Sequence, residues 1–220
     1  NTTADGNTAV GYSSLGANTT GTRNTSIGKD SLFTATTGDY NNAVGNGALY
    51  STTTADHNNA MGDTALYANT TGAHNTGLGS AALRFNTTGA NNTAVGSSAL
   101  YNNTTASNNV AVGHSALLAN TTGFDNVAVG NNAGDANTTG NGNTAVGYGS
   151  LSSDTLGDRA VAIGKNALIA QNFTSTTDNY NTAVGFAAGT AVTTGTNNTF
   201  VGGLAGDAIT TGSGNILIGY

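Results

Sequence analysis

The chain has 220 residues and a net charge of −6, and only 7% of its residues are charged, against about 25% in an ordinary soluble domain. Its five cations are spread along the chain and form no basic stripe, which excludes nucleic acid as an expected partner. The absence of Cys excludes disulfides and thiolate metal sites. There is no apolar run of about 18 residues, so we expect no membrane insertion by this sequence.

A short motif recurs from the start of the chain. Asn7-Thr8-Ala9-Val10-Gly11 returns as Asn24-Thr25-Ser26-Ile27-Gly28, seventeen residues later. Eleven of the twelve intervals between copies are seventeen residues, and the interval from Ile163 to Val184 is twenty-one. The copies centre on one large apolar residue each, in chain order Val10, Ile27, Val44, Met61, Leu78, Val95, Val112, Val129, Val146, Ile163, Val184, Val201 and Ile218.

Other positions recur around each centre. Gly follows every centre, and Asn stands three residues before it in every copy except the one with Ala160. Leu lies five residues after most centres, and Thr-Thr-Gly segments such as Thr19-Thr20-Gly21 close many repeats. The Leu position is Gly instead at Gly134, Gly189 and Gly206.

The repeat predicts strands and not helices. Seventeen residues are too few for a helical-hairpin repeat, and the apolar residues alternate with period two. Val, Ile and Thr favour strands, while Gly, Asn and Asp favour turns. We therefore predict an all-β fold, a parallel β-solenoid of about 13 coils in which each 17-residue repeat forms two short strands and two turns. Residues 1–220 are predicted to be a single repeat domain in a longer chain, and segment 169–180 contains a four-residue insertion.

Equivalent residues should stack above one another about 4.8 Å apart in such a fold. We expect the central apolar residues to face the Leu residues across the interior of each coil, and the Asn amides to bond to the coils above and below and to close a turn. The predicted structural ladders are represented by Val10, Val95 and Val146, by Gly11, Gly96 and Gly147, by Asn7, Asn92 and Asn143, and by Leu15, Leu100 and Leu151.

The same alternation places the residues beside each centre on the opposite side of the strand. With the central residues inside, a flat strip of Ala and Gly would face outward and let two backbones approach closely. We interpret this strip as a subunit interface, formed by Ala9, Ala43, Ala94 and Ala145 and widened near the C-terminal end by Phe200 and Leu217.

The recurring Asn-Thr-Ala-Val-Gly-x-x-Ala-Leu, as in Asn92 to Leu100, resembles the head repeats of YadA-type trimeric autotransporter adhesins. Related repeats occur in phage tail fibres. The resemblance covers essentially the whole chain. It implies a left-handed parallel β-roll, a homotrimer of chains lying side by side, and display on a bacterial cell surface or a virion, where the chain would bind a host-cell surface, matrix or glycan receptor.

Two groups of residues are candidate ligand-binding sites. An aromatic column, one residue after the Leu position, contains Phe33, Tyr50, Tyr67 and Tyr101, with Arg84 in the same register. These side chains are suited to binding glycan or protein, or to packing across a subunit boundary. The insertion carries Gln171, Asn172 and Phe173, which as a surface loop would either recognise a ligand or form a bulge without function.

No catalytic arrangement can be identified in the sequence. His57 and His74 lie one coil apart with Asp39 and Asp56 just before them, but a solvated turn explains them better than a metal site does. We therefore predict a protein that is not an enzyme and has no cofactor or metal.

The favoured function is an extracellular structural and adhesive repeat protein. The alternatives are a phage or virus tail fibre and a self-assembling surface filament. An ice-binding Thr ladder is disfavoured, because adjacent residues such as Thr19 and Thr20 point to opposite faces of a strand. Asn18-Thr19-Thr20 and its copies match the N-glycosylation sequon, which matters only in a eukaryotic secretory pathway.

Overall fold

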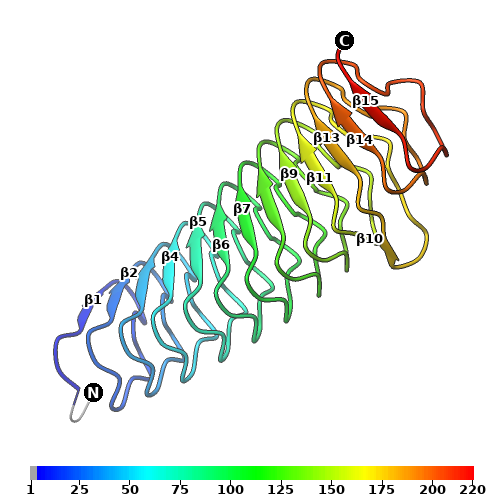
Figure 1. The fold of residues 1–220 in the computed structure, drawn as a ribbon. Coiled ribbons are helices and arrows are strands. Elements are labelled where there is room, and N and C mark those ends of the chain that lie inside the picture. Colours follow the sequence, from blue (N-terminus) through cyan, green and yellow to red (C-terminus); the bar gives the residue numbers. More distant parts are fainter. Residues whose placement is uncertain (1–3) are drawn as a thin grey trace. The chain divides into compact units, whose positions relative to one another are not determined.

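The computed structural model describes residues 4–220, and these residues form a parallel β-solenoid with no helix (Figure 1). Each coil contributes one three-residue strand, and successive strands begin seventeen residues apart except around the longer coil. This confirms the predicted fold class and period. The chain forms two compact units, Asn1–Asn108 and Asn109–Tyr220. The prediction that residues 1–220 form one repeat domain stays a prediction.

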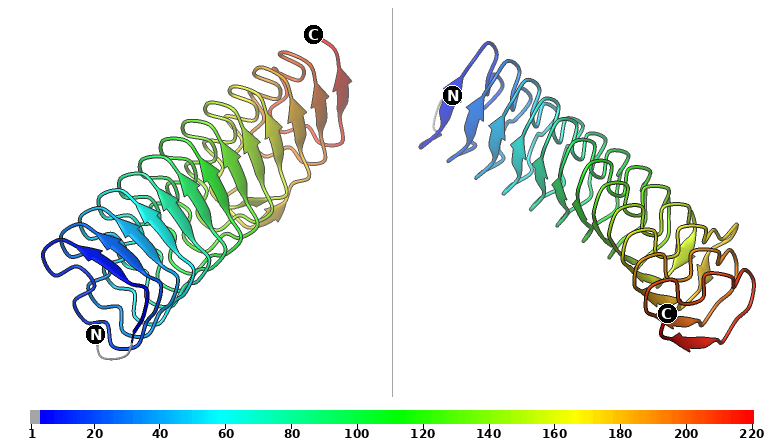
Figure 2. Two further views of the ribbon diagram at one scale, coloured as in Figure 1. Left: turned by 90° about the vertical axis from the view of Figure 1, so that its left-hand side faces the viewer. Right: turned by 90° about the horizontal axis from the view of Figure 1, so that it is seen from above.

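The strands of the first unit are β1 (Thr8–Val10), β2 (Thr25–Ile27), β3 (Asn42–Val44), β4 (Asn59–Met61), β5 (Thr76–Leu78) and β6 (Thr93–Val95). Equivalent residues pair in register, for example Ala43 with Ala60 and Val44 with Met61. In Figure 2 these strands, coloured blue to green, lie side by side along one side of their coils. Each sequence column is therefore a physical ladder.

The second unit repeats this arrangement with one addition. Its strands are β7 (Val110–Val112), β8 (Val127–Val129), β9 (Thr144–Val146), β11 (Val161–Ile163), β13 (Thr182–Val184), β14 (Thr199–Val201) and β15 (Ile216–Ile218). Ile163 pairs with Val184, so the four extra residues of the longer coil do not disturb the register. A separate two-stranded sheet joins β10 (Gly157–Asp158) to β12 (Thr177–Asp178).

The prediction of two strands per coil is wrong, because most coils have only one. Four positions in each coil have positive φ, as at Gly28 (133°), Asp30 (55°), Leu32 (45°) and Tyr40 (57°), and left-handed residues interrupt a strand. Backbone hydrogen bonds between coils continue through the turns. The N–H of Thr36, for example, donates to the carbonyl of Thr53 at 2.9 Å.

The predicted orientation of the strands is also wrong. The alanines beside the centres face the interior: Ala43 and Ala94 are fully buried and Ala145 is 2% exposed. The central residues face outward, with Met61 56% exposed. The alternation places the two columns on opposite sides of the strand, but it does not determine which side faces the interior. The interior has room for the leucine side chains and for one methyl group per coil from the alanine column. Where Gly77 replaces Ala, a Cβ would lie 3.4 Å from the Leu66 side chain, which is ordinary van der Waals contact.

The predicted Ala/Gly interface strip must be corrected accordingly. Ala43, Ala94, Ala145 and Phe200 line the interior and cannot meet another subunit. Ala9 and Leu217 are exposed, but they belong to the first and last coils that the structure describes. Of the three central residues chosen to represent their column, Val10 is 57% exposed, and Val95 and Val146 are half-buried. In the leucine column, Leu100 and Leu151 are buried as predicted, and Leu15 is half-buried.

The asparagine column forms the predicted hydrogen-bonded ladder. The N–H of Asn75 donates to Oδ1 of Asn58 at 3.0 Å, and the N–H of Asn92 donates in turn to Oδ1 of Asn75 at 3.0 Å. Asn75 Nδ2 also donates to the carbonyl of Gly89 at 2.8 Å and so closes the turn of its coil. The ladder continues in the second unit, where Asn143 donates from its N–H to Asn126 Oδ1 at 2.9 Å.

A second asparagine ladder, eight residues after the centres, was not foreseen. Asn86 Nδ2 donates to Asn69 Oδ1 at 2.8 Å and to the carbonyl of Gly89 at 3.0 Å. Both Asn side chains are fully buried. The two ladders therefore supply polar partners to the inward-facing backbone at the closing turn, where a buried carbonyl without a donor would be costly.

The glycine after each centre is required by close contact as well as by φ. Gly45 has a φ of 139°, and a Cβ there would lie 2.6 Å from the carbonyl carbon of Gly62 in the next coil. A methyl group would force the two coils apart at this point. The invariance of this column, represented by Gly11, Gly96 and Gly147, follows from coil stacking.

We predict that the two neighbouring residues of β6 differ sharply in their tolerance to substitution. Ala94→Val should lower the free energy of unfolding by about 1–3 kcal/mol, because it overpacks a fully buried site. Val95→Thr, in the outward column, should change it by less than about 0.5 kcal/mol. Urea denaturation of the two variants measures this, and the opposite ranking would restore the orientation expected from sequence.

Candidate binding surfaces

The outward side of the strands is an uncharged surface, which we call the strand face. It consists of the central column and the column two residues before it. In the first unit these pairs are Thr8 and Val10, Thr25 and Ile27, Asn42 and Val44, Asn59 and Met61, Thr76 and Leu78, and Thr93 and Val95. None of these residues is charged, and a shallow depression lies between Val44, Met61 and Leu78.

The strand face of the second unit is more apolar than that of the first. It pairs Val110 with Val112, Val127 with Val129, Thr144 with Val146, Val161 with Ile163, Thr182 with Val184, Thr199 with Val201, and Ile216 with Ile218. Val127 and Val129 are both 36% exposed although they belong to one strand. Large contiguous apolar surface is a feature by which interaction sites on proteins are recognised.

The predicted aromatic site in the first unit is a stacked ladder. The rings of Phe33 and Tyr50 have centroids 5.3 Å apart at an interplanar angle of 24°, and those of Tyr50 and Tyr67 are 4.9 Å apart at 11°. The facing sides of these rings therefore cover one another, and both faces of Tyr50 are occupied. This geometry favours a role in holding coils together over a role as a sugar-binding platform.

Arg84 and Tyr101, also predicted as site residues, belong to a second small cluster. The Arg84 guanidinium lies 5.6 Å from the ring centroid of Phe85 and 6.0 Å from that of Tyr101. Phe85 and Tyr101 meet edge to face at 5.1 Å. Arg84 Nε is buried and makes no hydrogen bond within residues 4–220. The cation here packs against rings, as in a structural cation–π contact.

A further stacked column passes through the two histidines. Tyr40 and His57 have ring centroids 4.9 Å apart, and His57 and His74 are 5.0 Å apart at an interplanar angle of 21°. Arg23 donates to the Tyr40 hydroxyl at the N-terminal end of the column. Parallel rings do not converge on a common point between them, as the ligands of a metal ion must.

The carboxylates beside these histidines bind backbone amides. Asp39 Oδ1 accepts from the N–H of Thr22 at 2.6 Å, and Asp56 Oδ1 accepts from the N–H of Asp39 at 2.7 Å. Each Asp thus caps the preceding coil. Within the described part of the chain, no three His, Cys, Asp or Glu residues are grouped so that they could hold a metal ion.

The insertion is anchored from inside by two of its three candidate residues, while residues 174–176 are exposed. Gln171 is fully buried and Phe173 is 5% exposed, and only Asn172 of the three predicted residues is exposed. The buried carboxylate of Asp154 accepts from Gln171 Nε2 at 2.6 Å and from the N–H groups of Gly157 and Phe173 at 3.0 and 3.2 Å. Gln171 Oε1 then accepts from Asn181 Nδ2 at 2.8 Å.

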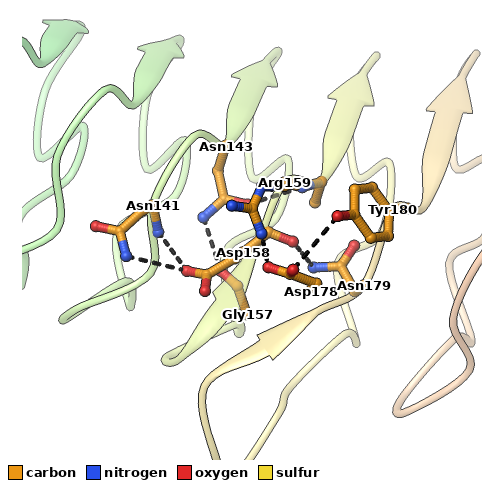
Figure 3. Close-up of polar contacts among 9 residues, drawn as sticks. Asn141, Asn143, Gly157, Asp158, Arg159, Asp178, Asn179 and Tyr180 are labelled. Carbon is orange, nitrogen blue, oxygen red and sulfur yellow. Dashed lines mark hydrogen bonds and ion pairs between the residues drawn. The ribbon is translucent and has the colours of Figure 1, made fainter.

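The far end of the insertion is held by the residues around Asp158 (Figure 3). Asp158 Oδ1 accepts from the N–H of Asn141 at 2.6 Å, and the Asp158 carbonyl accepts from Asn179 Nδ2 at 2.6 Å. Arg159 forms an ion pair with Asp178, whose Oδ2 accepts from the Tyr180 hydroxyl at 3.3 Å. Asn179 Oδ1 also caps Asn181, as the asparagine missing at Ala160 would have done.

One carboxyl group has a shifted pKa. Desolvation by burial raises the pKa of Asp135 above its ordinary value, although backbone N–H groups of Asp135 and Ala136 partly offset this. Its Oδ1 has no hydrogen-bond partner within residues 4–220. Because the folded-state pKa is the higher one, ionisation of Asp135 costs stability as the pH rises through that pKa.

Searches for similar proteins give no match: no family model, no curated protein and no solved structure is significantly similar to this chain. None of the described residues belongs to a helix long and apolar enough to cross a membrane.

We predict that Asp154 stabilises the longer coil. Asp154→Ala should lower the free energy of unfolding by about 2–3 kcal/mol, because it removes a buried acceptor from Gln171, Gly157 and Phe173. Hydrogen exchange should show faster exchange at the amides of Gly157 and Phe173. Thr174→Ala, at the exposed residue next to Phe173, is the control and should change neither quantity. Unchanged protection in Asp154→Ala would contradict this role.

Proposed function

We propose that the chain is a non-enzymatic, extracellular structural and adhesive repeat protein that assembles as a homotrimer through its strand face. The single observation that supports this most strongly is the strand face itself, which exposes Val, Ile, Leu, Met, Thr and Asn over every coil without a charged residue. In this proposal the chain belongs to the YadA-like head repeats of trimeric autotransporter adhesins, and it is displayed on a bacterial cell surface.

The energetics favour association over many coils. Fully burying a Val or Ile side chain is worth about 1.5–3 kcal/mol, and a side chain that is already half-buried contributes correspondingly less. Association costs about 4–15 kcal/mol in lost freedom of motion, so contacts from several coils must add up. The strand face provides them at a constant spacing, and two copies therefore have matching periods along their length.

The adhesive part of the proposal follows from the rigidity of the coil. Backbone hydrogen bonds and asparagine ladders order most of each coil, so side chains on its outer surface are held at regular intervals. Regularly spaced weak contacts, repeated over three chains, give a high combined affinity for a surface. The proposed partner is a host-cell surface, matrix or glycan receptor.

A second candidate, ice binding, is favoured by one observation. In β2, β5 and β6 the strand face presents Thr and an aliphatic residue at alternate positions, so two columns face outward together. The Thr19-Thr20 pairs do not provide this arrangement. The trimer and an ice surface would compete for the same face, so the two proposals can be separated. The phage or virus tail fibre and the self-assembling filament remain alternatives that share the solenoid.

We predict that light scattering of the purified chain will give the mass of three copies. Replacing Val95 and Val112 by Glu should shift this mass to one copy, because buried carboxylates would face each other across the interface. The matched control replaces Ser97 and His114 by Glu, two residues further along the same coils and outside the strand face. A wild-type monomer at all concentrations would refute the trimer, and a polymer that grows with concentration would indicate the filament.

The adhesive role requires its own measurement. The labelled chain should bind cultured eukaryotic cells or matrix-coated wells in flow cytometry or plate assays, and the Glu variants of the strand face should bind less as avidity is lost. Binding to bacterial cells alone would favour the tail fibre. Ice recrystallisation inhibition that is lost in the Val95 and Val112 variant of a monomeric chain would favour ice binding.

A further inference from the structure

Three successive coils of the second unit expose an unusual set of side chains two residues after their centres. The residues are Tyr148, Lys165 and Phe186, and Gly203 follows in the next coil. Tyr148 is 53% and Phe186 56% exposed, and Lys165 is exposed between them. Most other residues at this position are small or polar, so the set is a local departure from the repeat.

Coil stacking fixes the spacing of the three side chains. The carbonyls of Tyr148, Lys165 and Phe186 accept from the N–H groups of Asn166, Ala187 and Leu204 at 2.8 to 2.9 Å, each in the following coil. Successive backbones are therefore about 4.8 Å apart, which places Tyr148 and Phe186 about 10 Å apart with Lys165 midway. The extra residues of the longer coil leave this register intact.

Lys165 is a cation without a carboxylate. Its Nζ lies 5.7 Å from the ring centroid of Tyr148. The ion pairs among residues 4–220 join Lys29 to Asp30 and Arg159 to Asp178, and none includes Lys165. A solvated ammonium group beside an aromatic ring is able to accept an anionic ligand with little rearrangement.

The Phe186 ring is available in a way that the stacked aromatic ladder is not. Phe33, Tyr50 and Tyr67 cover each other's faces. On the side of Phe186 toward the next coil, Gly203 has no side chain, and a Cβ built there would have only a Tyr220 ring carbon within 4.0 Å. A half-exposed ring with an uncovered face is a platform for another apolar surface.

We propose that Tyr148, Lys165 and Phe186 bind an acidic saccharide, a pyranose that carries a carboxylate. The C–H face of the sugar packs on the exposed rings, and its carboxylate pairs with the Lys165 ammonium. An acidic peptide fits less well, because exposed aromatic rings offer flat faces, which match the C–H face of a sugar ring better than an extended peptide. This proposal rests on the proposed adhesive role and names the chemical class of the receptor.

The first unit contains a natural comparison. Tyr12 and Lys29 occupy the same position in two successive coils, and Tyr12 is 76% exposed. However, Lys29 Nζ lies 3.8 Å from Asp30 Oδ2, and Asn46 stands where a second aromatic ring would be needed. We therefore expect no saccharide binding there, and Tyr12 and Lys29 provide matched control variants.

The test uses short oligosaccharides and ligand-observed saturation-transfer NMR on the full chain. Trigalacturonate is compared with its methyl ester, and sialyllactose with its methyl ester, so that each acid has a neutral partner with the same rings. The two acids also distinguish a uronate of a polysaccharide from a terminal sialate of a cell surface. The variants are Lys165→Gln, Phe186→Ala and Tyr148→Ala, with Lys29→Gln and Tyr12→Ala as controls.

The wild-type chain should bind at least one acid about tenfold more tightly than its neutral partner, as a charge-assisted contact implies. Lys165→Gln should abolish that preference, Phe186→Ala and Tyr148→Ala should weaken binding of both forms, and the controls should match wild type. Binding that is unaffected by Lys165→Gln, preference for an acidic peptide, or no binding of any of the four saccharides would overturn the site.

The adhesive role itself is assessed separately from this site. If the wild-type chain still binds cells or matrix while saccharide binding is absent, only the site is refuted. If it binds neither, the adhesive function fails together with the site.

Discussion

The structure depends on hydrogen bonding from each coil to the next through buried asparagine amides. In the first unit, Asn75 accepts a backbone N–H from one neighbouring coil through Oδ1, donates its own N–H to the other, and closes its turn through Nδ2. This uses a donor and an acceptor of the amide on two separate atoms, whereas an ionised Asp has no donor and a Ser or Thr hydroxyl has one atom for both roles. Where the longer coil has Ala160, Asn179 supplies the missing acceptor to Asn181 from a different sequence position. The hydrogen-bonding requirement is therefore kept even where the repeat is not.

Tight coils also determine what fills the interior. A coil with one three-residue strand and several left-handed turns encloses little space, so the alanine column and the leucine column share it. Phe200 shows how little space the interior offers. It stands in the alanine column, and the leucine positions of its own and the neighbouring coil are Gly189 and Gly206. A Cβ on Gly189 would lie 2.8 Å from the Phe200 ring. The larger residue on one side is thus matched by smaller residues on the other, which keeps the interior close-packed. The central residues are displaced to the surface as a consequence.

The sequence was sufficient for the fold class, the period, the register and the asparagine ladder, because a 17-residue repeat forces equivalent residues to stack. It was not sufficient for the orientation of Ala43 and Val44. Alternation shows that they lie on opposite sides of the strand, and both are apolar enough to be inside. The sequence contains one indication of the orientation. Phe200 replaces Ala where Gly189 and Gly206 replace Leu, which indicates that the alanine and leucine columns share one interior. Of the candidate site residues, Gln171 and Phe173 are buried, which the sequence did not indicate, because an insertion in a solenoid is usually exposed and the Asp154 that binds them lies seventeen residues before Gln171.

The division of labour between columns explains where function can vary. The asparagine, alanine, leucine and glycine columns hold the coil together, and the departures at Ala160 and Phe200 are compensated by Asn179 and by Gly189 and Gly206. The columns on the strand face and two residues after the centres point outward, so packing inside the coil does not restrict them. The strand face nevertheless stays uncharged throughout, which a purely solvated surface would not require. The column two residues after the centres differs from coil to coil, with Asn131, Tyr148, Lys165 and Phe186 in four successive coils. A constant surface suits contact with identical copies, while a variable surface suits a ligand that is recognised at one place.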